Sequence, residues 1–168
     1  KSTNSGQTFT ATHAIDREND ANGNSSANRS ALAVSAANSS YVYLLTGPAT
    51  ANGEFHGVFR SIDAGESFTL RTNTPNILGG SSTGSDNNHQ ERYDLAIAVS
   101  PTNISQVACG GIRLWTSTNG GSSFTWQDDN ASASSYYHPD IHDLTYHPLN
   151  SGILYMCVDG GIYRSTDN

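Results

Sequence analysis

The sequence predicts an all-β protein built from repeated four-stranded units, and three observations support this prediction. Only 14% of the 168 residues are charged, while Ser, Thr, Asn and Gly are abundant, a composition typical of short strands joined by many turns. Aromatic and β-branched residues recur in short clusters between polar runs. One short motif also recurs along the chain, with its first serines separated by 59, 56 and 48 residues.

The recurring motif reads STNSGQTF, SIDAGESF, STNGGSSF and, cut short, STDN. An acid or amide at its third position can accept backbone N–H bonds in a tight turn, and the glycine permits a positive φ. A catalytic residue is needed once, whereas these residues recur, so we interpret them as structural. They are Ser2, Asn4, Gly6, Ser61, Asp63, Gly65, Phe68, Ser117, Asn119, Gly121, Phe124, Ser165 and Asp167.

Strands are expected in the same order around each motif. Segments 31–45, 96–110 and 143–157 align without gaps, and each reads as a strand, an Asn-containing turn and a second strand. A third strand leads into the motif and a fourth follows it. Four short antiparallel strands per repeat are the pattern of a β-propeller blade, and the spacing agrees. We expect about three blades of a single propeller over 1–168, with blade repeats at roughly 1–30 (partial), 31–72, 93–127 and 140–168 (partial).

The pattern S-x-D-x-G-x-S/T-F/W resembles the Asp-box of the bacterial neuraminidase repeat, which occurs in propellers of sialidases, sortilin-type receptors and xyloglucanase-type glycoside hydrolases. Residues 91–168, and more loosely the first 90, also resemble exported surface proteins of Bacteroidota, which often carry a type IX secretion signal. This resemblance implies an extracellular or cell-surface location and Asp-boxes that lie away from the ligand face. Both chain ends fall inside a motif, so we expect a fragment whose partners include the remaining blades of a parent chain.

Charge and hydropathy argue against two classes of partner. The net charge is −7 and no basic stripe is present, so we do not expect nucleic acid as a partner. No apolar run approaches the roughly 18 residues that a membrane-spanning helix needs, so no membrane span is expected. Loops 11–29, 46–56, 72–92 and 127–139 would lie on the ligand face, where variable polar segments usually carry function.

The segment HPDIHD is the sharpest local constellation. On a strand, His138, Asp140 and His142 would project from one face and could bind a divalent metal, the one cofactor that we consider. The alternative is that these side chains hydrogen-bond neighbouring loops and strands.

Three acids and three further side chains complete the candidates. Asp94 paired with Asp140 or Asp143 could supply the two carboxylates of glycoside hydrolysis. Tyr136 and Tyr137 could stack on a sugar, and His89 lies in the mixed-charge segment NNHQERYD. Solvated loop charges and blade packing are the alternatives for these residues.

Two functions remain open from the sequence. The first is a non-catalytic surface propeller that binds glycan or protein as an adhesin or scaffold. The alternative is a glycoside hydrolase of the xyloglucanase-like or sialidase-like propeller type. Arginines before the motifs read as repeat structure rather than as a cluster for a substrate carboxylate, which argues against sialidase activity.

Overall fold

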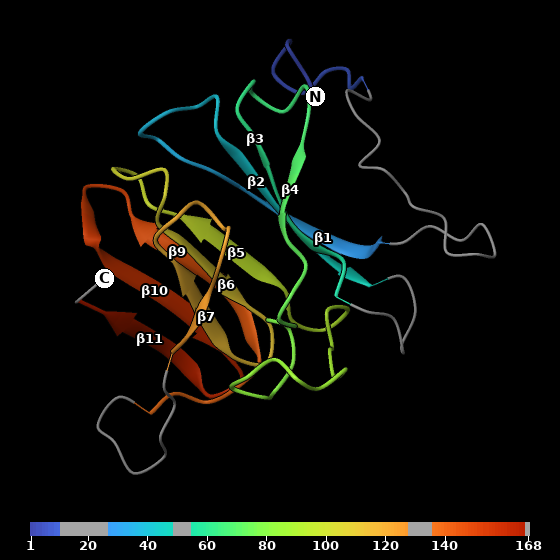
Figure 1. Ribbon diagram of the computed structural model, residues 1–168. Helices are drawn as coiled ribbons and strands as arrows, with labels where there is room; N and C mark the ends of the chain where they lie inside the picture. Colours follow the sequence, from blue (N-terminus) through green and yellow to red (C-terminus); the bar gives the residue numbers. More distant parts are fainter. Residues whose placement is uncertain (11–26, 49–54, 128–135, 167–168) are drawn as a thin grey trace, which may run out of the picture.

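The computed structural model describes residues 1–10, 27–48, 55–127 and 136–166. Within these ranges the regular secondary structure consists of β-strands without helices (Figure 1). No described segment forms a helix that is long and apolar enough to cross a membrane. The strands are β1 (Ala27–Val34), β2 (Val42–Pro48), β3 (Gly57–Ser61), β4 (Thr69–Thr72), β5 (Ala96–Val99), β6 (Val107–Gly110), β7 (Leu114–Ser117), β8 (Thr125–Trp126), β9 (Ile141–His147), β10 (Asn150–Val158) and β11 (Gly161–Ser165).

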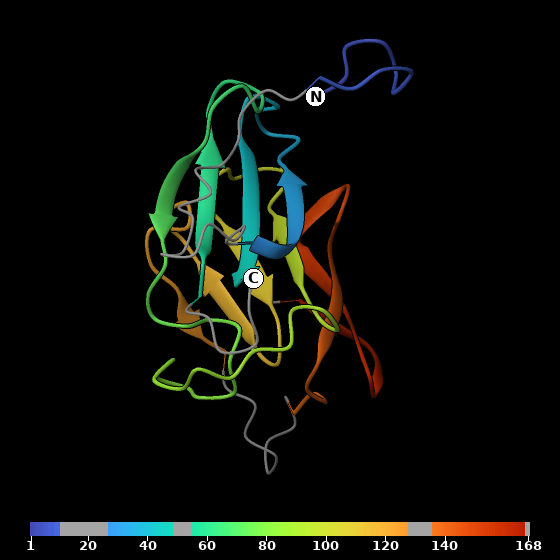
Figure 2. The ribbon, with the colours of Figure 1, turned by 90° about the vertical axis from the view of Figure 1, so that its right-hand side faces the viewer.

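The strands form three antiparallel sheets, each made of strands consecutive in sequence. The first sheet has the order β1-β2-β3-β4, the second β5-β6-β7-β8, and the third β9-β10-β11 within the described residues. β5 contacts both β1 and β9, so the second sheet lies between the other two (Figures 1 and 2). The predicted all-β class of repeated blade-like sheets is therefore confirmed.

The turn between β3 and β4 shows why the motif recurs. We call the segments 2–9, 61–68 and 117–124 the repeated turns. Oδ1 of Asp63 accepts hydrogen bonds from the hydroxyl of Ser61 at 2.6 Å and from the backbone N–H groups of Glu66 and Ser67 at 3.0 and 2.9 Å. Its Oδ2 accepts from the Ser67 hydroxyl at 2.5 Å. One side chain thus satisfies donors that the tight turn would otherwise leave unpaired.

The second repeated turn uses an amide for the same purpose. Oδ1 of Asn119 accepts from the Ser117 hydroxyl at 2.9 Å and from two backbone N–H groups, those of Ser122 and Ser123, at 3.0 Å each. Its Nδ2 donates to the Ser123 hydroxyl at 2.8 Å, where the carboxylate of Asp63 instead accepts from a serine. Asn4 in the N-terminal turn makes the corresponding contacts with Ser2 and Thr8, but the backbone N–H of Gln7 bonds the carbonyl of Asn4 at 3.3 Å instead of its side chain. Asp167 lies outside the described residues.

Glycine and phenylalanine also behave as the motif predicts. Gly6, Gly65 and Gly121 have φ values of 84°, 85° and 78°, a region that residues with a Cβ rarely adopt. Phe68 and Phe124 are half-buried, and Phe124 packs against the core between the first and second sheets. Each repeated turn is therefore closed by polar groups, and at 117–124 the aromatic ring also attaches the following strand to the core, whereas Phe9 in the N-terminal turn is 78% exposed.

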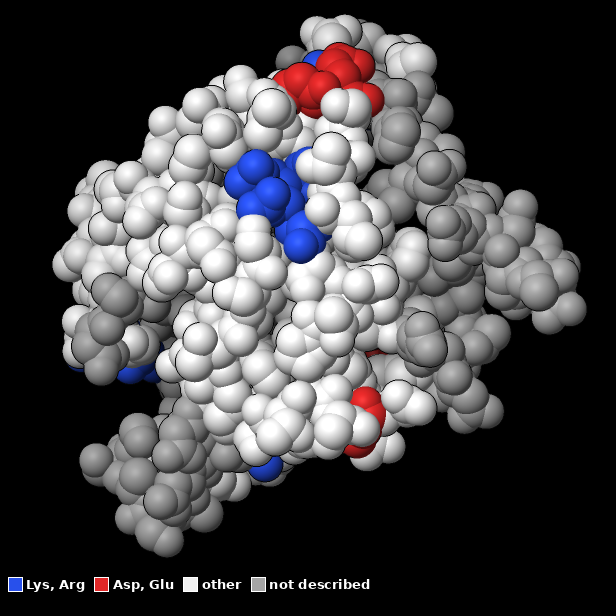
Figure 3. Space-filling model, viewed as in Figure 1, with Lys and Arg blue, Asp and Glu red and all other residues white. Residues whose placement is uncertain are grey.

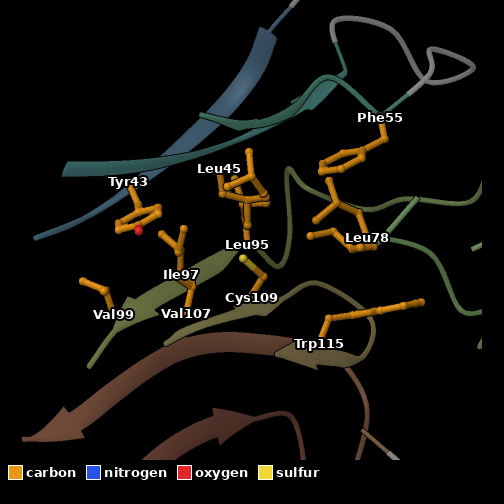
Figure 4. Close-up of a cluster of buried hydrophobic side chains, with 12 residues drawn as sticks. Tyr43, Leu45, Phe55, Leu78, Leu95, Ile97, Val99, Val107, Cys109 and Trp115 are labelled. Carbon is orange, nitrogen blue, oxygen red and sulfur yellow. The ribbon is translucent and has the colours of Figure 1, made fainter. Parts of the chain in front are cut away.

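Two apolar cores hold the sheets together. In the first core, large side chains from the first and second sheets meet around Tyr43, Leu45, Ile97 and Val107 (Figure 4). In the second core, the second sheet presents small residues, Ala96, Ala98 and Ala108, to larger ones of the third sheet and of the segment before β9. The larger residues are Tyr137, Ile141, Leu144, Tyr146, Leu154, Met156 and Val158. Because the second sheet is covered on both sides, β5 and β6 are buried at every position and lack polar alternation.

Polar contacts at the edge of the first core add a second connection between neighbouring sheets. The guanidinium of Arg71 on β4 donates to the carbonyls of Gly120 and Asn119 at 2.9 and 3.4 Å, and to the Ser122 hydroxyl. The hydroxyl of Tyr43 donates to the carbonyl of Ile104 at 2.6 Å. The repeated turn of one sheet is thereby attached to the outer strand of the preceding sheet.

The outer face of the first sheet is open. Leu32 and Val34 are 64% and 55% exposed, although they align with Ile97 and Val99 of the second sheet, which are 7% and 6% exposed. The aligned residues of the third sheet, Leu144 and Tyr146, are also buried. The face of the first sheet that carries Leu32 and Val34 is therefore exposed to solvent, whereas the corresponding faces of the second and third sheets pack against the preceding sheet.

A test of the repeated turn compares two variants of Asp63. Asp63→Ala leaves the turn donors unpaired and should lower the melting temperature by several degrees, whereas Asp63→Asn should be tolerated because Asn119 performs the same task. Hydrogen bonds from Ser61 and Ser67 hold the pKa of Asp63 well below its usual range. Its contribution to stability is therefore present above about pH 4 and is lost as the pH falls further.

Thermal unfolding between pH 2 and pH 7 checks this prediction. The wild type should lose stability below about pH 4 through this group, and Asp63→Asn should lack that component. Equal melting temperatures for Asp63→Ala and wild type at pH 7 would contradict the structural role.

Aligned positions on two sheets provide a second test. Ile97→Ala should lower the free energy of unfolding by about 2–4 kcal/mol, because it leaves a cavity in the first core. Leu32→Ala, the aligned change on the open face, should cost less than about 1 kcal/mol in this chain. Urea unfolding measures both, and equal losses would show that the Leu32 face is covered in solution.

Candidate functional site

The side chains that could carry function lie at the edge of the sheets opposite the repeated turns. The long connection from β4 to β5 runs to this edge, and the described residues 136–140 before β9 lie at it; we call it the loop face (Figure 1). Each connection ends in a segment that enters the inner strand of the next sheet, residues 87–95 before β5 and 136–140 before β9. These two entry segments hold most of the residues predicted from sequence.

Each entry segment is anchored to the preceding sheet. Nη1 of Arg29 on β1 donates to the carbonyls of Glu91 and Arg92 at 3.2 and 3.1 Å. The backbone N–H of Asp140 donates to the carbonyl of Ile112 at 3.1 Å. A Cβ on Gly110 would lie 2.6 Å from a methyl group of Ile141, so glycine is needed there for close approach. Sheet stacking thus places the two entry segments side by side.

A side-chain amide joins one acid from each entry segment. Nε2 of Gln90 donates to Oδ2 of Asp94 at 3.1 Å and also to Oδ1 of Asp140. Two hydrogen bonds to one nitrogen keep those oxygens within about 6 Å of each other. The structure therefore brings together two of the three predicted acids. The third, Asp143, lies on β9 with an exposed side chain that accepts from Thr145 at 3.3 Å, and it does not join them.

A third carboxylate lies close to the same place. Asp159, between β10 and β11, accepts hydrogen bonds from the hydroxyl of Tyr93 at 2.8 and 2.9 Å, and its Oδ1 lies 2.7 Å from Nε2 of His142. The rings of Tyr93 and His142 meet edge to face with centroids 4.8 Å apart. We call Gln90, Tyr93, Asp94, Asp140, His142 and Asp159 the acidic cluster.

The carboxylates of the acidic cluster have different protonation properties. Asp94 is fully buried, and burial, together with the charge of Asp140, raises its pKa to about 7. Hydrogen bonds from His142 and Tyr93 lower the pKa of Asp159, so that group is ionised at neutral pH. The same bond to Asp159 raises the pKa of Tyr93, which remains a phenol donor. The cluster therefore combines a fixed negative charge with an acid that titrates near neutrality.

The metal hypothesis for HPDIHD is not supported by this geometry. β9 begins only at Ile141, and Asp140 has a positive φ of 69°, so the alternation expected of a strand fails. Nδ1 of His138 pairs with the carbonyl of Pro139 at 3.0 Å, whereas Asp140 and His142 have the partners given above. Among the described residues, no group of three or more His, Cys, Asp or Glu side chains is arranged to hold a metal ion.

The predicted ligand-binding residues Tyr136, Tyr137 and His89 differ in how far they are exposed to solvent. Tyr136 is 40% exposed on the loop face and is free to contact a ligand. Tyr137 is buried in the second core, and its hydroxyl accepts from the backbone N–H of Leu114 at 3.0 Å, so it is a packing residue. The side chain of His89 is only 6% exposed, with Nδ1 2.5 Å from Oε2 of Glu91, so it offers little surface to a ligand.

Sequence reasoning missed two members of the acidic cluster. Gln90 is a neutral residue inside a charged segment, and nothing local marks it as a bridge between carboxylates. Asp159 lies in the DGG turn after β10, which resembles an ordinary tight turn. Its distance in sequence from Tyr93, 66 residues, gives no signal without the fold.

Comparison with known proteins identifies the fold. No family model and no curated protein match the chain. Among solved structures, an ancestral GH74 enzyme is similar with a TM-score of 0.50 and 20% identity over 86% of this chain. The GH74 xyloglucanase from Xanthomonas campestris is similar with a TM-score of 0.53 and 19% identity over 82% of this chain. The chain spans only 18% and 22% of their lengths.

A third structure, YCF48 bound to D1 peptide, has 16% identity over 81% of this chain and 36% of its own, and its TM-score of 0.48 is too low for inference. The first two similarities agree with the observed sheets, and the chain has the architecture of a partial β-propeller. At these identities the likeness establishes the fold alone.

The raised pKa of Asp94 leads to a prediction about stability. Between about pH 4 and pH 7, Asp94 is protonated in the folded chain and ionised in the unfolded chain. The free energy of unfolding therefore falls as the pH rises through that window. Asp94→Asn removes this component and should gain on the order of 2 kcal/mol relative to wild type at pH 8. Urea unfolding at pH 4 and pH 8 measures it, with Asp143→Asn as the exposed control; an unchanged slope would contradict the prediction.

Proposed function

We propose that this chain is part of a non-catalytic β-propeller that binds a glycan or a protein surface through its loop face, in an extracellular or cell-surface setting. The observation that carries the proposal is the burial of Asp94, the acid best placed for catalysis. Glycoside hydrolysis requires two carboxylates that flank the scissile bond. A fully buried acid tied to the amide of Gln90 cannot reach a sugar in this arrangement.

Exposed aromatic side chains on the loop face support a binding role. Tyr93 and Tyr136 are 53% and 40% exposed, and Tyr93 lies beside polar groups of the acidic cluster. Aromatic rings next to fixed polar groups provide contact area and orientation together, as ligand sites generally require. The repeated turns lie at the opposite edge, and their polar groups are already satisfied within each turn.

The remaining blades of a longer chain are the second proposed partner. The Leu32 and Val34 face is apolar and exposed where the aligned faces of the other sheets are stacked. A further blade of the same repeat would cover it in the same way.

Figure 3 shows that Lys and Arg side chains form no continuous stripe on the side of the molecule viewed there.

A glycoside hydrolase is the alternative function. The fold likeness to the GH74 xyloglucanase supports it, and an acid with a pKa of about 7 is a suitable general acid. This alternative requires a rearrangement that exposes Asp94 to substrate.

Incubation of the chain with xyloglucan separates the two functions. We expect no release of reducing ends above the level of an Asp94→Asn variant, and retention of any bound polysaccharide in intact form. Release of reducing ends that Asp94→Asn abolishes and Asp143→Asn preserves would overturn the non-catalytic proposal.

A further inference from the structure

We propose that the acidic cluster is a binding site for a basic side chain, an arginine guanidinium or lysine ammonium presented by a polypeptide. This inference rests on the binding function proposed above and specifies its ligand as protein rather than glycan. The site is formed by the carboxylates of Asp94, Asp140 and Asp159 together with the exposed ring of Tyr93.

The first argument is that three carboxylates converge with His142, the ion-pair partner of Asp159, as the one basic side chain among the groups that reach them in the described residues. Three carboxylates from three separate segments converge, and in the described part of the chain none of them forms an ion pair with Lys or Arg. The neighbouring cation, Arg29, donates to the backbone carbonyls of Glu91 and Arg92 instead. The donors that do reach the cluster are an amide, a phenol and an imidazole, from Gln90, Tyr93 and His142.

The second argument is an unpartnered atom inside the cluster. Asp94 has no exposed surface, and within the described ranges its Oδ1 has no hydrogen-bond partner. Its Oδ2 shares the Gln90 amide with Asp140, so this carboxylate belongs to the cluster rather than to the apolar core. Natural proteins rarely leave a buried polar atom unpaired, and the exceptions usually mark a functional role or a water molecule or ion at that position.

The third argument is the chemistry around the acids. A guanidinium or ammonium forms charge-assisted hydrogen bonds with carboxylates and is also attracted to the face of an aromatic ring. Asp159 and Tyr93 are exposed and Asp140 is half-buried, so an incoming side chain can contact all three while Asp94 adds its field from behind. The amide of Gln90 occupies the position of a donor between two carboxylates, which a stronger cationic donor can replace.

Nuclear magnetic resonance titration tests the inference. The probe is a short Gly-Ser peptide with a single central arginine, and the matched control peptide carries citrulline, which keeps the shape and removes the charge. The ring resonances of His142 and Tyr93 should shift with the arginine peptide, and the citrulline peptide should bind at least about tenfold more weakly. Affinity for the arginine peptide should fall as salt is raised.

Protein variants localise the effect. Asp140→Asn and Asp159→Asn should each weaken binding by about tenfold, because each removes a charged acceptor. Asp143→Asn removes an exposed carboxylate on β9 that lies outside the cluster, and it should change affinity less than about twofold. Unchanged melting temperatures confirm that each variant is folded.

Three results would overturn the inference: equal binding of the citrulline peptide, an equal loss with Asp143→Asn, or no shift of either ring at any arginine-peptide concentration. A xyloglucan oligosaccharide, titrated in parallel, distinguishes failure of this inference from failure of the proposed function. If the oligosaccharide binds and the peptide does not, the proposed binding function stands and the basic ligand is wrong. If the oligosaccharide is hydrolysed, the proposed non-catalytic function itself is wrong.

Discussion

Each sheet of this chain is only three or four short strands wide in the described residues and has two faces to bury, so no sheet can be stable without a neighbour. The second sheet meets this requirement fully, with large side chains on one face and alanines on the other. Stacking in turn fixes where the connections between sheets run. The entry segments before β5 and β9 are held to preceding sheets by Arg29 and by the carbonyl of Ile112. The loop face therefore depends on the apolar contacts between sheets.

The opposite edge is organised by local polar bonding. Asp63 and Asn119 satisfy the same backbone donors, although one carries a charge and the other does not. What the turn requires is an acceptor of the right length, and charge is incidental to it. The polar side chains of the repeated turns bond within each turn, so this edge has a structural role, whereas Asp94 on the loop face keeps an unpaired buried oxygen.

The acidic cluster has an energetic cost for the folded chain. Placing Asp94 in a buried position beside Asp140 raises its pKa to about 7, which means that its ionised form is unfavourable in the fold. Hydrophobic residues of similar size would pack at lower cost. A buried carboxylate with one unpaired oxygen next to two other carboxylates separates this edge from ordinary blade packing, and it is the reason for proposing a cationic partner.

The sequence by itself determined the strand order, the repeated turns and the all-β class, because these depend on hydrogen bonds and side-chain alternation within a few neighbouring residues. Asp63 and Gly65 could be assigned their roles from the residues of the motif itself, 61–68. Only the tertiary structure decided the site. Gln90 and Asp140 are 50 residues apart and meet only after two sheets have stacked. The positive φ of Asp140 and the start of β9 at Ile141 removed the strand geometry on which the metal hypothesis depended. Contacts between distant segments arise from packing, and local sequence pattern carries no record of them.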